Sequence, residues 1–277
     1  MNIMNKTKTF IAIALFSVGI TCFATGTGDV MPEMSTMMAS KKPKPVTVER
    51  NCSTFTSIEN KTPCNVFYKQ GETIKVSIVA PQDQTDKINT YVENGVLVIE
   101  MEDNTFIKDT KNVKINVESP SLESVSIAGS GNITVQSPLN TSGKDLSVSV
   151  KGSGIIKTKK VECNEITANI SGSGNVEIGE LQASSAQVEV NGSGNVEYNG
   201  MKISKKLEAT INGSGNVAIN GKVDVVNVEV RGSGNLTGKV DCDNVTATIK
   251  GSGDVKLSGD IKAHYTTVTG SGRVTIK

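Results

Sequence analysis

Hydrophobic and polar residues alternate with a period of two along most of residues 119–277. A β-branched residue recurs two positions before a regularly placed glycine, at Ile127, Val150, Ile170, Val190, Ile211, Val230, Ile249 and Val268. An aliphatic residue follows the same glycine by four positions, at Ile133, Ile156, Val176, Val196, Val217, Leu236, Val255 and Val274. These offsets are all even, with polar residues between them, which predicts β-strands that bury one face.

The glycine opens a repeated Gly-Ser-Gly tripeptide. Its eight copies are spaced by 23, 20, 20, 21, 19, 19 and 19 residues and begin at Gly129, Gly152, Gly172, Gly192, Gly213, Gly232, Gly251 and Gly270. A fixed period near 20 residues predicts a solenoid. Both glycines fall on the inward-facing parity, so we expect a corner where the interior narrows and serine points outward.

The fold class that follows is all-β, a right-handed parallel β-helix with about 20 residues per turn and Gly-Ser-Gly corners. The left-handed form is the alternative. A leucine-rich repeat has a similar period, but its Leu-x-x-Leu-x-Leu frame is missing from these units. The β-helix domain is predicted over residues 47–277, with regular repeats over 119–277.

Residues 47–118 lack Gly-Ser-Gly but contain strand-like runs at 65–68, 73–79 and 95–101. We expect irregular N-terminal turns here, which would also cap the first end of the solenoid.

Residues 1–24 have the layout of a signal peptide: Lys6 and Lys8, an apolar run from Phe10 to Ile20, and small residues up to Ala24. The apolar run is too short to span a membrane. An alternative is a lipid anchor on Cys22. Both predict export, to the periplasm, the outer-membrane surface or the extracellular space.

Residues 25–46 combine methionine, lysine and proline with no apolar period. Such a segment buries too little surface to offset the entropy of ordering it, which predicts a flexible linker. Without residues 1–24 the chain has 27 basic and 28 acidic residues. This near-neutral charge gives no electrostatic reason to expect nucleic acid as a partner.

Four cysteines follow the predicted signal peptide. Cys52 and Cys64 enclose a short segment and are the plausible disulfide in an oxidising compartment. Cys163 and Cys242 occupy similar places four turns apart, roughly 19 Å at about 4.8 Å per stacked strand. That distance exceeds the reach of a disulfide, so we expect both to be free thiols.

Several runs of the sequence resemble the head GIN domain family of putative autotransporter adhesins. They begin with Phe55-Thr-Ser-Ile-Glu59, continue with residues 66–71 and 94–99, and end with the Gly-Ser-Gly-Asn-Val repeats. The resemblance covers about residues 47–277. It implies a β-helix exposed in the cell envelope, mainly of Bacteroidetes, and it brings no established activity and no catalytic residues.

The third residue after each first glycine is the most regular exposed position. Asparagine occupies it at Asn132, Asn175, Asn195, Asn216 and Asn235. Such a row could bind a glycan or a cation, but stacked amides also hydrogen-bond one another along a solenoid, and the structural role is favoured. Repeated calcium sites need clustered carboxylates, and only Asp254 adds one in this row, so no metal or other cofactor is predicted.

His264 is the single histidine. One histidine cannot form a multi-histidine metal site, and its inward parity predicts a partly buried structural role. Enzymes that act on polysaccharides often use aromatic platforms, and this chain has no Trp and only four Tyr.

Three functions remain. The favoured one is a non-enzymatic envelope or secreted protein with an adhesin-like surface for an envelope protein or a glycan. The first alternative is a structural protein that assembles with copies of itself through terminal β-edges. The second is a polysaccharide-acting enzyme.

Overall fold

The computed structural model describes residues 44–277, which belong to one compact unit. The predicted signal peptide 1–24 and all but the last three residues of the predicted linker 25–46 lie outside the described residues. The first strand begins at Pro45, two residues before the predicted start of the β-helix domain at residue 47.

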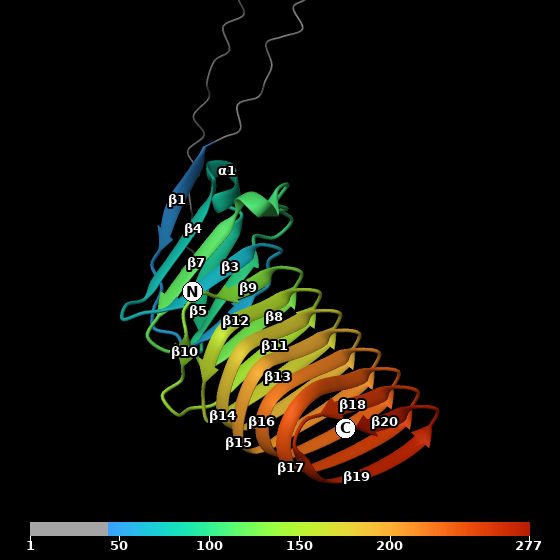
Figure 1. Cartoon of the computed structure of the whole chain (residues 1–277). Helices are drawn as coiled ribbons and strands as arrows, with labels where there is room; N and C mark the ends of the chain where they lie inside the picture. Colours follow the sequence, from blue (N-terminus) through green and yellow to red (C-terminus); the bar gives the residue numbers. More distant parts are fainter. Residues whose placement is uncertain (1–43) are drawn as a thin grey trace, which may run out of the picture. The chain divides into compact units, whose positions relative to one another are not determined.

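From residue 124 onward the strands stack in parallel, each against the strand one turn further along the chain (Figure 1). The first glycine of each corner pairs with the first glycine of the next, as Gly192 does with Gly213. The predicted parallel β-solenoid is therefore confirmed. Its strands are β8 (Ser124–Gly129), β9 (Asn132–Val135), β10 (Leu139–Asn140), β11 (Leu146–Gly152), β12 (Ile155–Glu162), β13 (Glu165–Gly172), β14 (Asn175–Gly192), β15 (Asn195–Gly213), β16 (Asn216–Gly232), β17 (Asn235–Gly251), β18 (Asp254–Ser258), β19 (Ile261–Gly270) and β20 (Arg273–Ile276).

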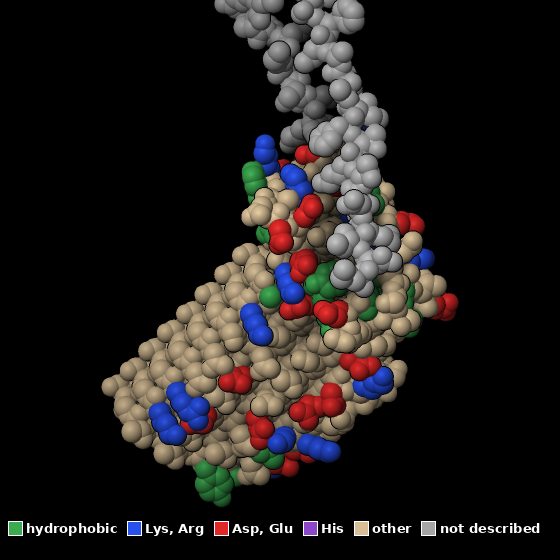
Figure 2. Space-filling model, turned by 180° about the vertical axis from the view of Figure 1, so that it is seen from behind, with side chains coloured by type: hydrophobic (Ala, Val, Ile, Leu, Met, Phe, Trp, Pro, Cys, Tyr) green, Lys and Arg blue, Asp and Glu red, His purple; other side chains and the backbone are tan. Residues whose placement is uncertain are grey.

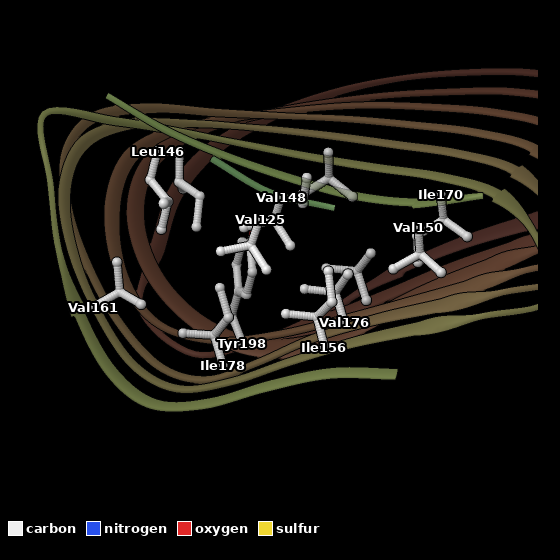
Figure 3. Packing of buried hydrophobic residues seen from close by; sticks show 14 of the residues in the cluster. Val125, Leu146, Val148, Val150, Ile156, Val161, Ile170, Val176, Ile178 and Tyr198 are labelled. Carbon is white, nitrogen blue, oxygen red and sulfur yellow. The ribbon is translucent and has the colours of Figure 1, made fainter. Parts of the chain in front are cut away.

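Each regular turn has one sharp corner and one smooth bend. In β14 to β17 a single strand leaves one Gly-Ser-Gly, curves through the bend and returns to the next Gly-Ser-Gly. The cross-section in Figure 3 is accordingly rounded around Val161 and flattened toward Val150 and Ile170. The bend carries no tripeptide that repeats in every turn, although Gly221 and Gly259 in this region also have positive φ, at 137° and 121°.

The smooth bend absorbs the differences in repeat length. Between β14 and β15 the register shifts after Ala183, where one residue of β14 faces Ser204 and Lys205 of the 21-residue turn. Two further shifts between β15 and β16 return the spacing to 19 residues. The corner register stays unbroken, so insertions bulge outward at the bend and leave the glycine stack aligned.

The interior is filled by the predicted inward-facing rows. Val190, Ile211 and Val230 are fully buried and lie one above another. Figure 3 shows Val150, Ile170, Val176 and their neighbours pointing into the space between the two sheets. Burial of each such side chain contributes about 1.5 to 3 kcal/mol, and repetition over the turns replaces a globular core.

Glycine is required at both corner positions for different reasons. Gly213 has a φ of 130°, in the region where side chains are strained. A Cβ on Gly215 would collide with the carbonyl oxygen of Gly194 and with the Val190 side chain below it. The predicted explanation of the tripeptide is confirmed.

The N-terminal turns are irregular, as predicted, but their order in space differs from their order in the chain. β2 pairs in parallel with β8 on one side and with β6 on the other, and β3 lies between β9 and β7 in the same way. The turn made by residues 57–70 is thus enclosed by two turns that follow it in sequence. The elements are β1 (Pro45–Arg50), β2 (Ser57–Asn60), β3 (Asn65–Gln70), β4 (Lys75–Pro81), α1 (Gln82–Thr85), β5 (Ile88–Glu93), β6 (Val96–Met101), η1 (Thr110–Asn112) and β7 (Lys114–Ser119).

Antiparallel strands complete this end. β5 pairs with β6 over one sheet, while β4 and then β1 extend the other sheet beyond β7. Inward residues of β4 and β5, such as Ile78 and Ile88, are buried, so the apolar interior continues through these strands.

Candidate functional site

The predicted asparagine row forms a hydrogen-bonded ladder on the sheet that follows each corner. Oδ1 of Asn175 accepts from the main-chain nitrogen of Asn195 at 3.2 Å and from its Nδ2 at 2.9 Å. Oδ1 of Asn195 accepts from Asn216 at the same two distances, and Asn235 Nδ2 donates to Asn216 Oδ1 at 2.9 Å. The amide oxygens of this ladder are therefore used within the protein.

The ladder continues through residues that break the asparagine pattern. Asn132 Oδ1 accepts from the main chain of Ile155 at 3.0 Å, and Asn235 Oδ1 accepts from that of Asp254 at 3.0 Å. Asp254 then accepts from the main chain of Arg273 at 3.1 Å. The Lys256 ammonium, which donates to Asp254, lowers the pKa of that carboxyl. Most rungs accept from the backbone of the next turn, as the structural interpretation of the row requires. Asn216 accepts from the Asn235 side chain alone, and Ile155 interrupts the ladder because its side chain has no acceptor.

The ladder also has a member that the sequence pattern did not reveal. Asn132 Nδ2 donates to Oδ1 of Asn65, which begins β3. The preceding corner is Thr62-Pro63-Cys64, in place of Gly-Ser-Gly. Oδ1 of the buried Asn60 accepts from the nitrogen and the hydroxyl of Thr62 and so closes this corner. No glycine signature marks this turn, so periodicity could not find Asn65.

Outward-facing side chains on the opposite sheet are arranged differently. We call this surface the pre-corner face; it is the outer side of β8, β11, β13 and the parts of β14, β15, β16, β17 and β19 that lead into each corner. The row five residues before each corner comprises Ser124, Ser147, Thr167, Gln187, Glu208, Asn227, Thr246 and Tyr265. The row three residues before it comprises Ser126, Ser149, Asn169, Glu189, Thr210, Glu229, Thr248 and Thr267.

Many of these polar groups have no partner among residues 44–277. The side chains of Gln187, Asn227 and Thr246 make no hydrogen bond there, nor do those of Thr210 and Thr248. They are amides and hydroxyls, which both donate and accept. The pre-corner face is therefore a regular array of unused hydrogen-bonding groups, whereas the asparagine ladder is self-satisfied.

Two hollows lie on the pre-corner face. One of about 290 Å³ is lined by Gln187, Glu208, Thr210, Asn227 and Thr248, among others. Another of about 630 Å³ lies further toward the N-terminal turns, beside Ser147, Thr167 and the loop of residues 140–145. Both include members of the same row, so the two hollows follow the solenoid axis.

Glu229 supplies a fixed negative group on this face. Its carboxylate accepts from Arg231 at 2.6 Å and from Lys250 at 2.9 Å. The hydrogen bond from Lys250, followed by the charge of Arg231, lowers the pKa of Glu229. A general acid in glycoside hydrolysis needs a carboxyl that remains protonated, so Glu229 is unsuited to that role.

Tyr265 ends the row beside Thr246. It points outward from β19 and is 70 % exposed, which makes it a flat aromatic surface open to solvent. Sequence reasoning identified the tyrosines only as a small count. The available signal was parity, because Tyr265 stands at the same odd offset as Thr246 in the preceding turn.

A third hollow, of about 660 Å³, lies at the smooth bend instead, beside Cys163, Gln182, Lys202 and Lys222. Burial raises the pKa of the Cys163 thiol to about 12, so the thiol stays protonated and is a poor nucleophile at neutral pH. Lys222 lies 3.9 Å from Asp241 of the next turn. Figure 2 shows charges of both signs interspersed over one face of the molecule. The bend thus presents a mixed surface without a reactive group.

The expected Cys52–Cys64 disulfide is not formed. The four cysteines of the described residues are free thiols, which confirms the expectation for Cys163 and Cys242 and contradicts the one for Cys52 and Cys64. Cys64 is fully buried inside the Asn60–Thr62 corner, where its nitrogen donates to Thr62 Oγ1. Cys52 instead lies near Thr90 of β5, and burial raises the pKa of its thiol. Short sequence separation did not bring the two sulfur atoms together, because each joins a different part of the cap.

His264 keeps the predicted inward parity, since it pairs with the buried Val245, but it is exposed. The expectation of partial burial is wrong because β19 belongs to the last described turn, and no later strand among residues 44–277 stacks on it. Val268 of the same strand is 43 % exposed for the same reason.

The described residues contain no group of three or more His, Cys, Asp or Glu side chains able to hold a metal ion. In residues 44–277 there is also no helix with the length and apolar character needed to cross a membrane.

The sequence was compared with models of known protein families. The family model described as "Putative auto-transporter adhesin, head GIN domain" matches residues 54–235 and 208–277. The chain belongs to this family. The resemblance to head GIN domain proteins, inferred from the repeats and the N-terminal runs, is therefore confirmed. No curated protein matches the chain.

Solved structures share the fold of this head GIN domain protein. A "putative adhesin" from Parabacteroides merdae is 24 % identical, with 85 % of this chain and 97 % of that chain covered and a TM-score of 0.76. One from Parabacteroides distasonis is 21 % identical, with 85 % and 98 % covered and a TM-score of 0.78. A "putative lipid binding protein" from Parabacteroides distasonis is 21 % identical, with 85 % and 98 % covered and a TM-score of 0.72. At these identities the likeness establishes the fold alone.

Proposed function

We propose that the protein is an exported, non-enzymatic envelope protein that presents its pre-corner face to a protein or glycan partner, in the manner of an adhesin. The family description supports an adhesin-like role. The signal-peptide layout of residues 1–24 supports export. The partner is outside the cytoplasm in this proposal.

One observation carries the proposal: unused amides and hydroxyls are repeated in register on a rigid sheet. Asn227 and Thr246 occupy successive positions of one row, and Gln187 lies two turns before Asn227 in the same row. Their strands are held on both sides by neighbouring turns, so little conformational entropy is lost when a partner binds. Exposed polar groups fixed by a scaffold are typical of recognition surfaces.

The test is retention of envelope fragments from the producing cells on beads that carry the purified protein. A variant with Thr210→Lys and Asn227→Lys crowds the pre-corner face with two long cations and should lose retention. The matched control, Ala218→Lys with Thr237→Lys, adds the same charge to the opposite sheet and should retain the fragments. No retention by the natural protein, or equal retention by both variants, would contradict the proposal.

The attachment of the exported protein is tested separately. Signal-peptidase cleavage leaves a mature N-terminus after Ala24, whereas lipidation leaves an acylated Cys22. Mass spectrometry of the mature protein distinguishes these forms, and protease treatment of intact cells then reports whether the solenoid faces outward. Export would be contradicted if the protein were found in the cytoplasm, with residues 1–24 still attached and no lipid on Cys22.

Self-association is a second candidate function, because the last described turn leaves an apolar edge. Val268 is 43 % exposed, and β19 pairs with β17 on one side only within the described residues. Unpaired strand edges recruit further strands. Light scattering of the natural protein should reveal a dimer that Val268→Lys abolishes, and a strictly monomeric natural protein at high concentration would rule this role out.

A further inference from the structure

We propose that the pre-corner face binds a saccharide chain that lies along the solenoid axis, over the row from Thr167 to Tyr265. This inference rests on the proposed function, since it names the class of partner for the same surface. It is carried by the free hydrogen-bonding groups, the hollow above them and the aromatic ring at the end of the row.

The spacing of the groups suits a polymer of similar units. Neighbouring turns are about 4.8 Å apart, so the row offers one polar side chain per step along the axis. Gln187, Asn227 and Thr246 each donate and accept hydrogen bonds. A sugar hydroxyl also does both, and a row of amides and hydroxyls can therefore satisfy it at successive units.

The hollow of about 290 Å³ lies directly over this set, between Gln187 and Thr248. Glu208 and Glu229 add carboxylate acceptors beside the amides. Arg231 and Lys250 hold Glu229 in place and offset its charge, which leaves a fixed acceptor without a strong local field. Such a surface favours neutral hydroxylated ligands over polyanions.

Tyr265 provides the aromatic contact. Its ring is 70 % exposed and stands one turn beyond Thr246 in the same row. A sugar ring has an apolar face of C–H groups that packs on such a ring, while the phenol hydroxyl remains available for a hydrogen bond. The row therefore ends in a stacking platform that an amide could not supply.

A peptide partner fits this face less well. Extended peptides bind by adding a strand to a free sheet edge. β15 and β16 are paired on both sides, so their backbone groups are already used. The outward side chains in the row are polar as far as Thr246, which gives a peptide no apolar pocket for an anchor residue.

The experiment is isothermal titration of the purified protein with maltohexaose, cellohexaose and N-acetylchitohexaose. We expect at least one to bind with a dissociation constant below the millimolar range. Tyr265→Ala should weaken that binding about three- to tenfold, by loss of the stacking contact. Tyr91→Ala is the matched control, because Tyr91 is the other exposed tyrosine at 39 % and lies in the N-terminal cap.

A second pair of variants tests the hydrogen-bonding row. The double variant Asn227→Ala with Thr246→Ala should bind the same hexasaccharide more weakly, whereas Thr237→Ala on the opposite sheet should leave its binding unchanged. Circular dichroism melts of all variants should coincide, since these side chains make no internal hydrogen bonds.

The outcomes separate this inference from the proposed function. Absence of binding by all three hexasaccharides at millimolar concentration overturns the saccharide site. Binding that Tyr265→Ala and the Asn227/Thr246 variant leave unchanged overturns its location. Retention of envelope fragments on the beads without saccharide binding would leave the proposed function standing with a different partner. If the protein neither retained envelope fragments nor bound a saccharide, both the proposed function and the saccharide site would be overturned.

Discussion

Oδ1 of Asn195 accepts two hydrogen bonds from Asn216 of the next turn, one from the main-chain nitrogen at 3.2 Å and one from Nδ2 at 2.9 Å. One side chain thus ties both the backbone and the side chain of its successor. The most regular exposed row of the sequence is a set of hydrogen-bonded links between turns, and the recognition surface that we propose lies on the other sheet.

Loss of one of these hydrogen-bonded asparagines should lower the free energy of unfolding measurably. Asn195→Ala removes the acceptor for both bonds from Asn216, and we expect a loss of about 1 kcal/mol in the free energy of unfolding. Chemical denaturation measures it. Asn199→Ala is the control, because Asn199 is exposed and makes no side-chain hydrogen bond among the described residues. Equal stability of the two variants would show that the ladder contributes nothing.

The inward rows should not tolerate charge. Ile211 is fully buried between Val190 and Val230, so Ile211→Asp places an unpaired carboxylate in the core. We expect a loss of more than about 4 kcal/mol, seen as an unfolded circular dichroism spectrum. Thr210→Asp, one position away and facing outward, should keep the native spectrum. Similar behaviour of the two would mean that the parity is assigned wrongly.

Gly215 at a corner should be less tolerant of a side chain than Gly200 at the bend. Gly215→Ala forces a Cβ against the Gly194 carbonyl oxygen and the Val190 side chain, and we expect about 1 to 3 kcal/mol of destabilisation. At Gly200 a Cβ would meet only the Gly179 oxygen, at an ordinary 3.5 Å, so Gly200→Ala should change stability by less than about 0.5 kcal/mol. Thermal melts compare them. A reversed order would contradict the close-stacking role of the corner.

The buried thiol of Cys163 should make stability depend on alkaline pH. Burial raises its pKa from 9.0 to about 12. Between these values the unfolded chain releases the proton while the folded chain keeps it, so stability is full below pH 9 and falls as the pH rises toward 12. Denaturation of the natural protein and of Cys163→Ala between pH 8 and pH 10, as an approximate working range, should show a steeper decline for the natural protein. Parallel declines would show that this thiol is not protected.

The sequence alone was sufficient for the solenoid, its inward rows and its corners. Val190 and Ile211 follow a period of two, and Gly213 and Gly215 mark a backbone constraint, so local residue chemistry carries that information. The N-terminal turn of residues 57–70 escaped this reasoning, because Thr62-Pro63-Cys64 forms its corner with side-chain hydrogen bonds that leave no periodic signal. Its insertion between two later turns was equally invisible.

The candidate site depended on tertiary structure. Sequence showed that asparagines recur after each corner, but it did not single out Gln187, Asn227, Thr246 or Tyr265. It also could not tell which polar groups were already hydrogen-bonded. That depends on distances between residues about 20 positions apart, set when one turn stacks on the next. Periodicity determined the scaffold because burial repeats with the chain, whereas the free surface was decided only by stacking, which closes one row of hydrogen bonds and leaves the other open.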